Sequence, residues 1–154
     1  MPRSISPAVQ AAVAYAAFTA AHEVADFWVQ RDVDAVAKGK PGREGATACA
    51  RHVASYAATQ ALAVAAANRC LGLGLDWRRA AAGLAVSAIT HYLADRSAGH
   101  WPTNTADTPL VARLAHRAGK TQWLARDPGA PMHMDQAWHK GWIAVAAVIC
   151  ASRP

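Results

Sequence analysis

Residues 22–30, HEVADFWVQ, decide the fold of this chain because they place ionisable groups directly after a long apolar segment. His22, Asp26 and Gln30 follow one another at four-residue steps, and this spacing puts side chains on one face of a helix. An ionisable group in apolar surroundings is costly unless a partner or a metal satisfies it. We therefore predict a helix from residue 7 to about residue 30 that carries part of a buried polar centre.

Two later stretches repeat the pairing of an imidazole with a carboxylate. His91 and Asp95 in THYLADR, and Asp135 and His139 in MDQAWHK, are again four residues apart. A random distribution of the seven histidines and ten acidic residues would produce roughly one such pair. Each pair also lies within or beside an apolar run. The excess of pairs predicts that several helices contribute to the same polar centre.

The composition favours closely packed helices. Of the 154 residues, 53% are hydrophobic but only 7% are aromatic, and alanine, the strongest helix former, supplies much of the apolar share. We predict an all-α protein, a four-helix bundle formed as a single domain from residues 1–154. The long helices are expected at residues 7–30, 45–70, 77–96 and 132–151. A long loop with a short helix at residues 108–118 is expected between the third and the fourth.

An antiparallel bundle would bring these polar faces together at one level. The second helix adds His52, which shares a face with Tyr56 and Gln60. The predicted metal ligands are therefore His22, Asp26, His52, His91, Asp95, Asp135 and His139. Neutral imidazoles and carboxylates suit one or two divalent ions, zinc, manganese or iron. A metal-free network of hydrogen bonds and ion pairs is the alternative for the same residues.

A divalent metal in such a centre would lower the pKa of a bound water and polarise a phosphoryl oxygen. The sequence thus predicts a metal-dependent hydrolase that acts on a phosphoester. A small anionic substrate would be met by cations beside the metal, and the candidates are Lys38, Lys40, Arg43 and Arg96. Gln30 and Gln136 are expected to orient the ligands. The competing hypothesis is a non-enzymatic helical membrane or interaction protein whose polar residues fix the helix register.

The net charge of +6 suits several kinds of anionic partner. Nucleic-acid binding is disfavoured because the basic residues form no continuous run with interleaved aromatics. The apolar segments are short and every connection is basic, so no charge asymmetry indicates a membrane topology. We predict a cytoplasmic protein or one peripheral to the inner membrane, with a multi-pass inner-membrane protein as the alternative. The sequence favours no particular oligomeric state.

Five motifs, AAHEVADFWVQRD, KGKPG, CARHVASY, THYLADR and MDQAWHKGW, occur in this order. With them the chain, from about residue 21 to residue 142, resembles the bacterial and phage family catalogued as domain of unknown function 3307. The resemblance implies a small helical protein with no established activity, and many members are predicted membrane proteins. The recurring polar residues of the family correspond to His22, Asp26, Gln30, Lys38, His52, His91, Asp95, Asp135, Gln136 and His139.

Overall fold

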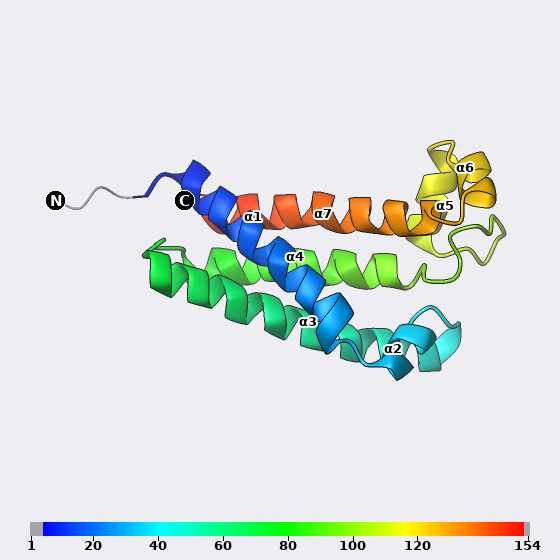
Figure 1. Cartoon of the computed structure of the whole chain (residues 1–154), viewed down its shortest axis with the longest axis horizontal. Coiled ribbons are helices and arrows are strands. Elements are labelled where there is room, and N and C mark those ends of the chain that lie inside the picture. The colour runs from blue at the N-terminus through cyan, green and yellow to red at the C-terminus, as the bar shows by residue number, and fades with distance from the viewer. Residues whose placement is uncertain (1–4, 153–154) are drawn as a thin grey trace.

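Four long helices run along the longest dimension of the molecule (Figure 1). The computed structural model describes residues 5–152, so the ends of the predicted domain, residues 1–4 and 153–154, lie outside the described range. The long helices are α1 (Pro7–Val24), α3 (Gly42–Leu71), α4 (Trp77–Asp95) and α7 (Ala130–Ala151). A π-helical turn, η1 (Ala25–Val29), extends α1. The short helices are α2 (Asp32–Ala37), α5 (Leu110–Arg117) and α6 (Thr121–Arg126).

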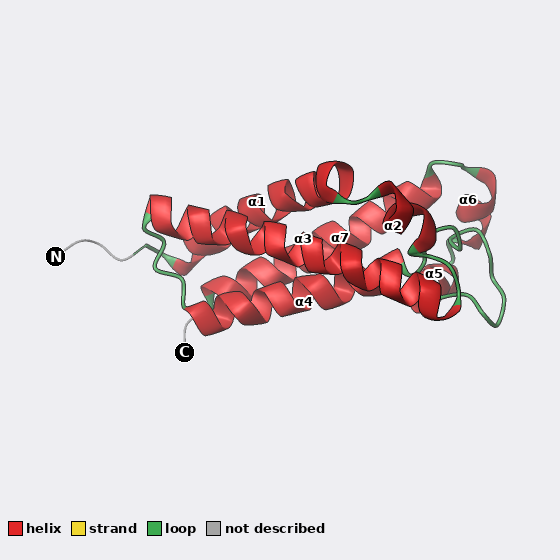
Figure 2. Ribbon diagram, turned by 90° about the horizontal axis from the view of Figure 1, so that it is seen from below, coloured by secondary structure: helices red, strands yellow, loops and turns green. Residues whose placement is uncertain are grey.

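The long helices form an antiparallel bundle. Helices α1 and α4 each pack against both α3 and α7, so α1 and α4 occupy diagonal positions. The short helices and the long connection between α4 and α7 gather at one end, opposite the described ends of the chain (Figures 1 and 2). This arrangement confirms the predicted all-α class and the four long helices. The short helix predicted at residues 108–118 is present as α5, whereas α2 and α6 were not predicted.

Local sequence signals determine where the long helices begin and end. Ser6 caps α1, because its hydroxyl accepts the backbone N–H of Val9 at 3.3 Å. Gly72 ends α3 in the left-handed conformation at φ 62°, which glycine adopts without strain. Asp76 caps α4 by accepting the N–H groups of Arg78 and Arg79, each at 3.0 Å. These are the caps that favour three separate helices at these positions.

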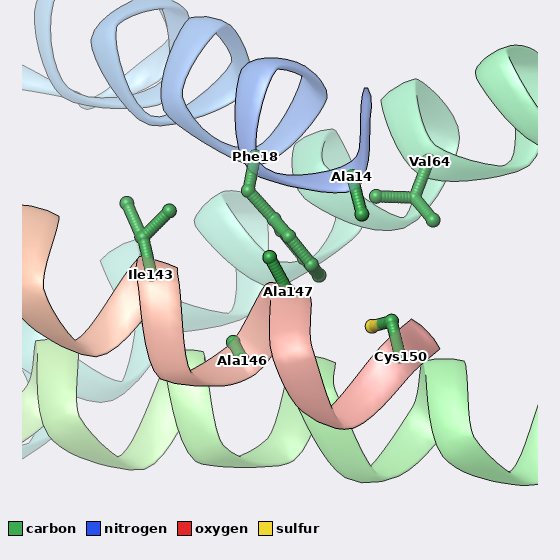
Figure 3. Close-up of a cluster of buried hydrophobic side chains, with 7 residues drawn as sticks. All are labelled: Ala14, Phe18, Val64, Ile143, Ala146, Ala147 and Cys150. Atoms are coloured by element: carbon green, nitrogen blue, oxygen red, sulfur yellow. The ribbon is translucent and has the colours of Figure 1, made fainter. Parts of the chain in front are cut away.

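Two apolar clusters flank the middle of the bundle. One lies toward the end where the described chain starts and stops, and its buried members are Ala14, Phe18, Val64, Ile143, Ala146, Ala147 and Cys150 (Figure 3). The other closes the opposite end and contains Trp101, Val111, Ala112, Ala115, Leu124 and Ala130. His22 follows Phe18 by one helical turn and His139 precedes Ile143 by one turn. The predicted polar residues therefore lie between the two apolar clusters.

Gly83 sets how closely α4 and α7 approach. A Cβ atom at Gly83 would lie 2.5 Å from Cys150 Sγ and 2.6 Å from the backbone oxygen of Ala146. We expect Gly83→Ala to lower the free energy of unfolding by about 1–3 kcal/mol, because overpacking outweighs the better helix propensity of alanine. Urea denaturation would measure the change. The matched control is Gly141→Ala on α7, where a Cβ would meet no atom within 4 Å and where we expect a gain of about 0.5–1 kcal/mol.

The length and hydrophobicity of the helices bear on whether the chain could span a membrane. Between residues 5 and 152, no helix is both long and apolar enough to cross a bilayer. The multi-pass alternative therefore has no candidate span in this part of the chain.

Candidate metal centre

Each of the four long helices contributes one histidine to a common centre. His22, His52, His91 and His139 come from α1, α3, α4 and α7, and each is 2% exposed or less. The antiparallel topology explains why the four histidines lie close together, since the ends of α1 and α4 lie beside the starts of α3 and α7. Four long helices thus place one imidazole each at the same level of the bundle.

Three carboxylates join the imidazoles, and one of them depends on the π-helical turn. Asp26 lies in η1, where the N–H of Gln30 donates to the carbonyl oxygen of Ala25 at 2.8 Å, a five-residue step. Such wider turns occur often at functional sites. Asp95 and Asp135 come from α4 and α7, and the side chains of Asp26, Asp95 and Asp135 are 11%, 2% and 24% exposed. All seven predicted ligands therefore meet.

The first set of ligand atoms consists of two imidazole nitrogens and one carboxylate oxygen. The Nε2 atoms of His52 and His91 are 2.9 Å apart. Asp95 Oδ2 lies 3.3 Å from each of them. A tetrahedral ion with bonds of about 2.0–2.1 Å would separate its ligand atoms by roughly 3.3 Å. This set therefore has nearly the spacing of the ligands of one metal ion.

The second set consists of His22, Asp26, His91 and His139, so it shares His91 with the first set. Asp26 Oδ2 lies 3.3 Å from His22 Nε2, and ligand atoms of His22, Asp26 and His139 all lie within 4.8 Å of one another. Asp135 Oδ2 adds a further oxygen 3.3 Å from His139 Nε2. A second ion would thus find up to three imidazoles and one carboxylate, with Asp135 beside them.

Two carboxylates face both sets. Asp26 Oδ1 lies 3.3 Å from His52 Nε2, while its other oxygen faces His22. Asp95 Oδ1 lies 3.9 Å from His139 Nε2, while its other oxygen faces His52 and His91. Asp26 and Asp95 are therefore placed as bridges between the sets.

Several atoms that face the centre have no hydrogen-bond partner within residues 5–152. They include the Nε2 atoms of His22 and His139 and the Oδ1 atom of Asp26, all buried. A buried polar atom left without a partner costs about 1–3 kcal/mol. A metal ion would satisfy such atoms, because neutral imidazole nitrogens and carboxylate oxygens are metal ligands. The buried histidine and aspartate groups can thus hold a metal ion.

Burial and neighbouring charges set the protonation states of the centre. Burial lowers the pKa of His22 to about 4 and also lowers the pKa of His91. Burial alone would raise the pKa values of Asp26 and Asp95, but the imidazoles that face them, His52 beside Asp26 and His91 beside Asp95, bring both below the ordinary value. His139 is the exception, because Asp135 outweighs burial and raises its pKa. Ionised carboxylates beside the neutral imidazoles of His22 and His91 are the forms that bind a divalent ion.

The lowered pKa of His22 predicts acid destabilisation of the chelator-treated protein. Between pH 6.5 and about 4, the unfolded chain binds a proton at His22 that the folded chain does not bind. The contribution of His22 to the free energy of unfolding should therefore fall by about 3 kcal/mol as the pH drops through this window. Urea denaturation at several pH values would measure the slope, and His22→Leu should reduce it. The control His133→Gln changes an exposed histidine and should leave the slope intact.

A cavity opens beside the centre. Its volume is about 300 Å³, and Asp26, Asp95 and Asp135 contribute to its wall. Lys38 also lines the cavity, and its Nζ lies 3.0 Å from Asp95 Oδ2. A small molecule in the cavity would thus contact three carboxylates of the centre and one cation.

The other predicted site residues separate into those that reach the cavity and those that do not. Gln30 and Gln136 line it, and Gln136 Nε2 donates to Asp135 Oδ2 at 3.5 Å. Lys40 instead pairs with Glu44 at 2.8 Å, and Arg43 is exposed outside the cavity. Arg96 donates to the backbone oxygen of Lys38. Of the four predicted cations, only Lys38 lines the cavity, while Arg96 holds the backbone of Lys38.

A polar network behind His91 adds residues that were not assigned to the site. Tyr56 stacks on His91 with ring centroids 3.8 Å apart. The hydroxyl of Tyr56 lies 2.8 Å from Ser87 Oγ and accepts from Gln60 Nε2 at 2.8 Å. Tyr56 and Gln60 share a helical face with His52, which was the one signal in the sequence. The network holds the His91 ring in place, because both partners of the tyrosine are buried.

No family model, curated protein or solved structure matches this chain. The resemblance to domain of unknown function 3307 thus remains a prediction from the five motifs. Fold and site together define an all-α bundle with a buried histidine and aspartate centre that can hold a metal ion.

Proposed function

We propose that the protein is a metal-dependent hydrolase of phosphoesters with a two-ion centre. The observation that carries the proposal is the meeting of four histidines and three aspartates beside a cavity, in overlapping groups that could each hold a metal ion. The buried Nε2 atoms of His22 and His139, which have no hydrogen-bond partner among the described residues, support a bound ion. A structural network alone would be expected to pair such atoms, because leaving them unpaired is costly.

The proposed ligand assignment follows the distances between the ligand atoms. One ion is held by His52, His91 and Asp95, whose ligand atoms are 2.9–3.3 Å apart. The other is held by His22, His139 and Asp26, and Asp135 lies beside it with Oδ2 3.3 Å from His139 Nε2. Two histidines and one carboxylate leave coordination positions open, which is typical of catalytic rather than structural zinc and iron sites.

Bound divalent ions would supply Lewis acidity toward the phosphoryl group and would acidify a water molecule. In the overall reaction, the water oxygen forms a bond to phosphorus, the bond between phosphorus and the leaving oxygen breaks, and that oxygen takes up a proton. Asp135 is the carboxylate best placed to accept the proton from water, because it lines the cavity and is the most exposed of the three. Lys38 would stabilise the negative charge on the phosphoryl oxygens.

Lys38 favours a phosphoester over a neutral substrate. Its side chain is 14% exposed and its ammonium group pairs with Asp95. The backbone of Lys38 is held by Arg96, so the cation is positioned at the centre. A cation held beside a metal site is suited to a phosphoryl group, whose oxygens share a negative charge.

Metal analysis of full-length protein purified without an affinity tag tests the proposal. We expect one to two equivalents of zinc, manganese or iron in the native chain and hydrolysis of p-nitrophenyl phosphate that a chelator abolishes. His91→Ala should lose metal and activity together. The control His133→Ala alters an exposed histidine outside the centre and should retain both. Absence of stoichiometric metal from the native chain would refute the proposal.

A non-enzymatic interaction protein is the second candidate, and the exposed apolar side chains near the cavity favour it. Phe27, Trp28 and Val36 are 60%, 86% and 77% exposed. In that case the contacts of His52 with Asp26 and with Asp95, each at 3.3 Å, would only tie the helices together. A native protein that contains no metal, and whose Tm a chelator does not change, would support this candidate.

A further inference from the structure

We propose that the substrate is a small phosphoester of an apolar, planar alcohol, and that the wall formed by Phe27, Trp101 and Met132 recognises the alcohol. The inference rests on the proposed function and specifies the substrate class of the same site. It follows from the two chemically different sides of the cavity beside the metal centre.

The polar side of the cavity accounts for the phosphoryl group. Asp26, Asp95 and Asp135 bring the centre to the cavity, and Lys38 supplies the one lysine or arginine side chain among the lining residues. Gln30 adds a neutral donor, because its Nε2 atom is buried and has no hydrogen-bond partner in the described chain. One cation and one free amide match a single phosphoryl group and its ester oxygen.

The apolar side accounts for the rest of the substrate. Phe27 from η1 and Met132 from the first turn of α7 line the cavity and are 60% and 59% exposed. Trp101, which is 4% exposed, lines the same cavity from the turn after α4. Aromatic rings and a thioether make favourable contacts with planar apolar groups. A ligand that covered Phe27 and Met132 would remove apolar surface from water.

Size and charge distinguish this substrate from two others. A cavity of about 300 Å³ is at the small end of ligand pockets, which span about 300–1,000 Å³. A polynucleotide would need several cations along its path, whereas Lys38 is the sole lysine or arginine of the described cavity wall. A sugar phosphate would place its hydroxyl groups against Phe27 and Met132, whose exposed apolar side chains offer them no hydrogen-bonding group. A single small aromatic phosphoester fits best.

Equilibrium binding of non-hydrolysable probes to the full-length, metal-loaded chain tests the inference. Calorimetry would compare phenylphosphonate, methylphosphonate and inorganic phosphate. We expect phenylphosphonate to bind about tenfold more tightly than methylphosphonate. Phe27→Ala and Met132→Ala should each reduce this preference to about threefold or less, with the affinity for inorganic phosphate unchanged. Both side chains are largely exposed, so these variants should fold.

Trp28→Ala is the matched control, because Trp28 follows Phe27 in η1, is 86% exposed and does not line the cavity. It should keep the tenfold preference. Equal affinities for the two phosphonates in metal-loaded protein that binds phosphate would overturn the inference and leave the metal centre intact. Loss of the preference in Trp28→Ala to the same extent as in Phe27→Ala would also overturn it. Absence of metal from the native chain would instead refute the proposed function.

Discussion

Asp95→Asn is expected to lower kcat/KM for p-nitrophenyl phosphate by about a thousandfold. Asp95 Oδ2 lies 3.3 Å from the Nε2 atoms of His52 and His91 and 3.0 Å from Lys38 Nζ. Asparagine keeps the shape of the side chain but removes the negative charge that both an ion and the lysine require. Steady-state kinetics and metal analysis of the same preparation would measure the two consequences together.

Asp107→Asn is the control for this prediction, since Asp107 is exposed and lies outside the cavity of the centre. It should retain native metal content and rate. A folded Asp95→Asn protein with unchanged metal content and unchanged kcat/KM would contradict the assignment of Asp95 as a ligand.

Removal of metal should produce the largest change in stability. An ion held at a free concentration a thousand times its Kd stabilises the folded state by about 4 kcal/mol. For a chain of this size, that corresponds to a fall in Tm of about 8–16 °C on chelation. The physical reason is that buried atoms such as His22 Nε2 and His139 Nε2 lose their partner when the ion leaves. Calorimetric scans with and without a chelator would measure the shift.

His91→Ala provides the comparison for the chelation experiment. His91 contributes Nε2 to the first ligand set and also packs on Tyr56, so its variant should have a lower Tm that no longer responds to the chelator. His133→Ala should respond as the native chain does. A native Tm that is insensitive to complete chelation would favour the metal-free network, in which Lys38 and the imidazoles alone balance the carboxylates.

The recurrent spacing of histidine and aspartate was sufficient to predict the ligands as a group. His22 and Asp26, like His91 and Asp95, share a helical face whatever the tertiary structure, and apolar neighbours require such a face to be buried or paired. The caps at Ser6 and Asp76 likewise depend on residues nearby in the chain. The fold class and the candidate ligands could therefore be predicted from local sequence patterns.

Other features of the site had no local signal. The π-helical turn that carries Asp26 lies within a segment that reads as a continuous helix. The helices α2 and α6 each span only six residues, too short for periodicity to be recognised. Lys38 and Lys40 are equivalent in sequence, yet Lys38 contacts Asp95 while Lys40 pairs with Glu44. The direction of a lysine side chain from a loop depends on what packs against that loop.

The sequence by itself determined the long helices, their order and which polar residues share each face, because these follow from interactions over one or two turns. The tertiary structure decided how the faces combine. The close approach of α4 and α7 at Gly83 and the diagonal placement of α1 and α4 set how each helix is rotated about its axis and how closely it packs against its neighbours. Those variables bring the candidate ligands together in overlapping groups and leave a cavity that Lys38 and the apolar wall line. Side-chain packing between distant segments determines them, and no local spacing encodes it.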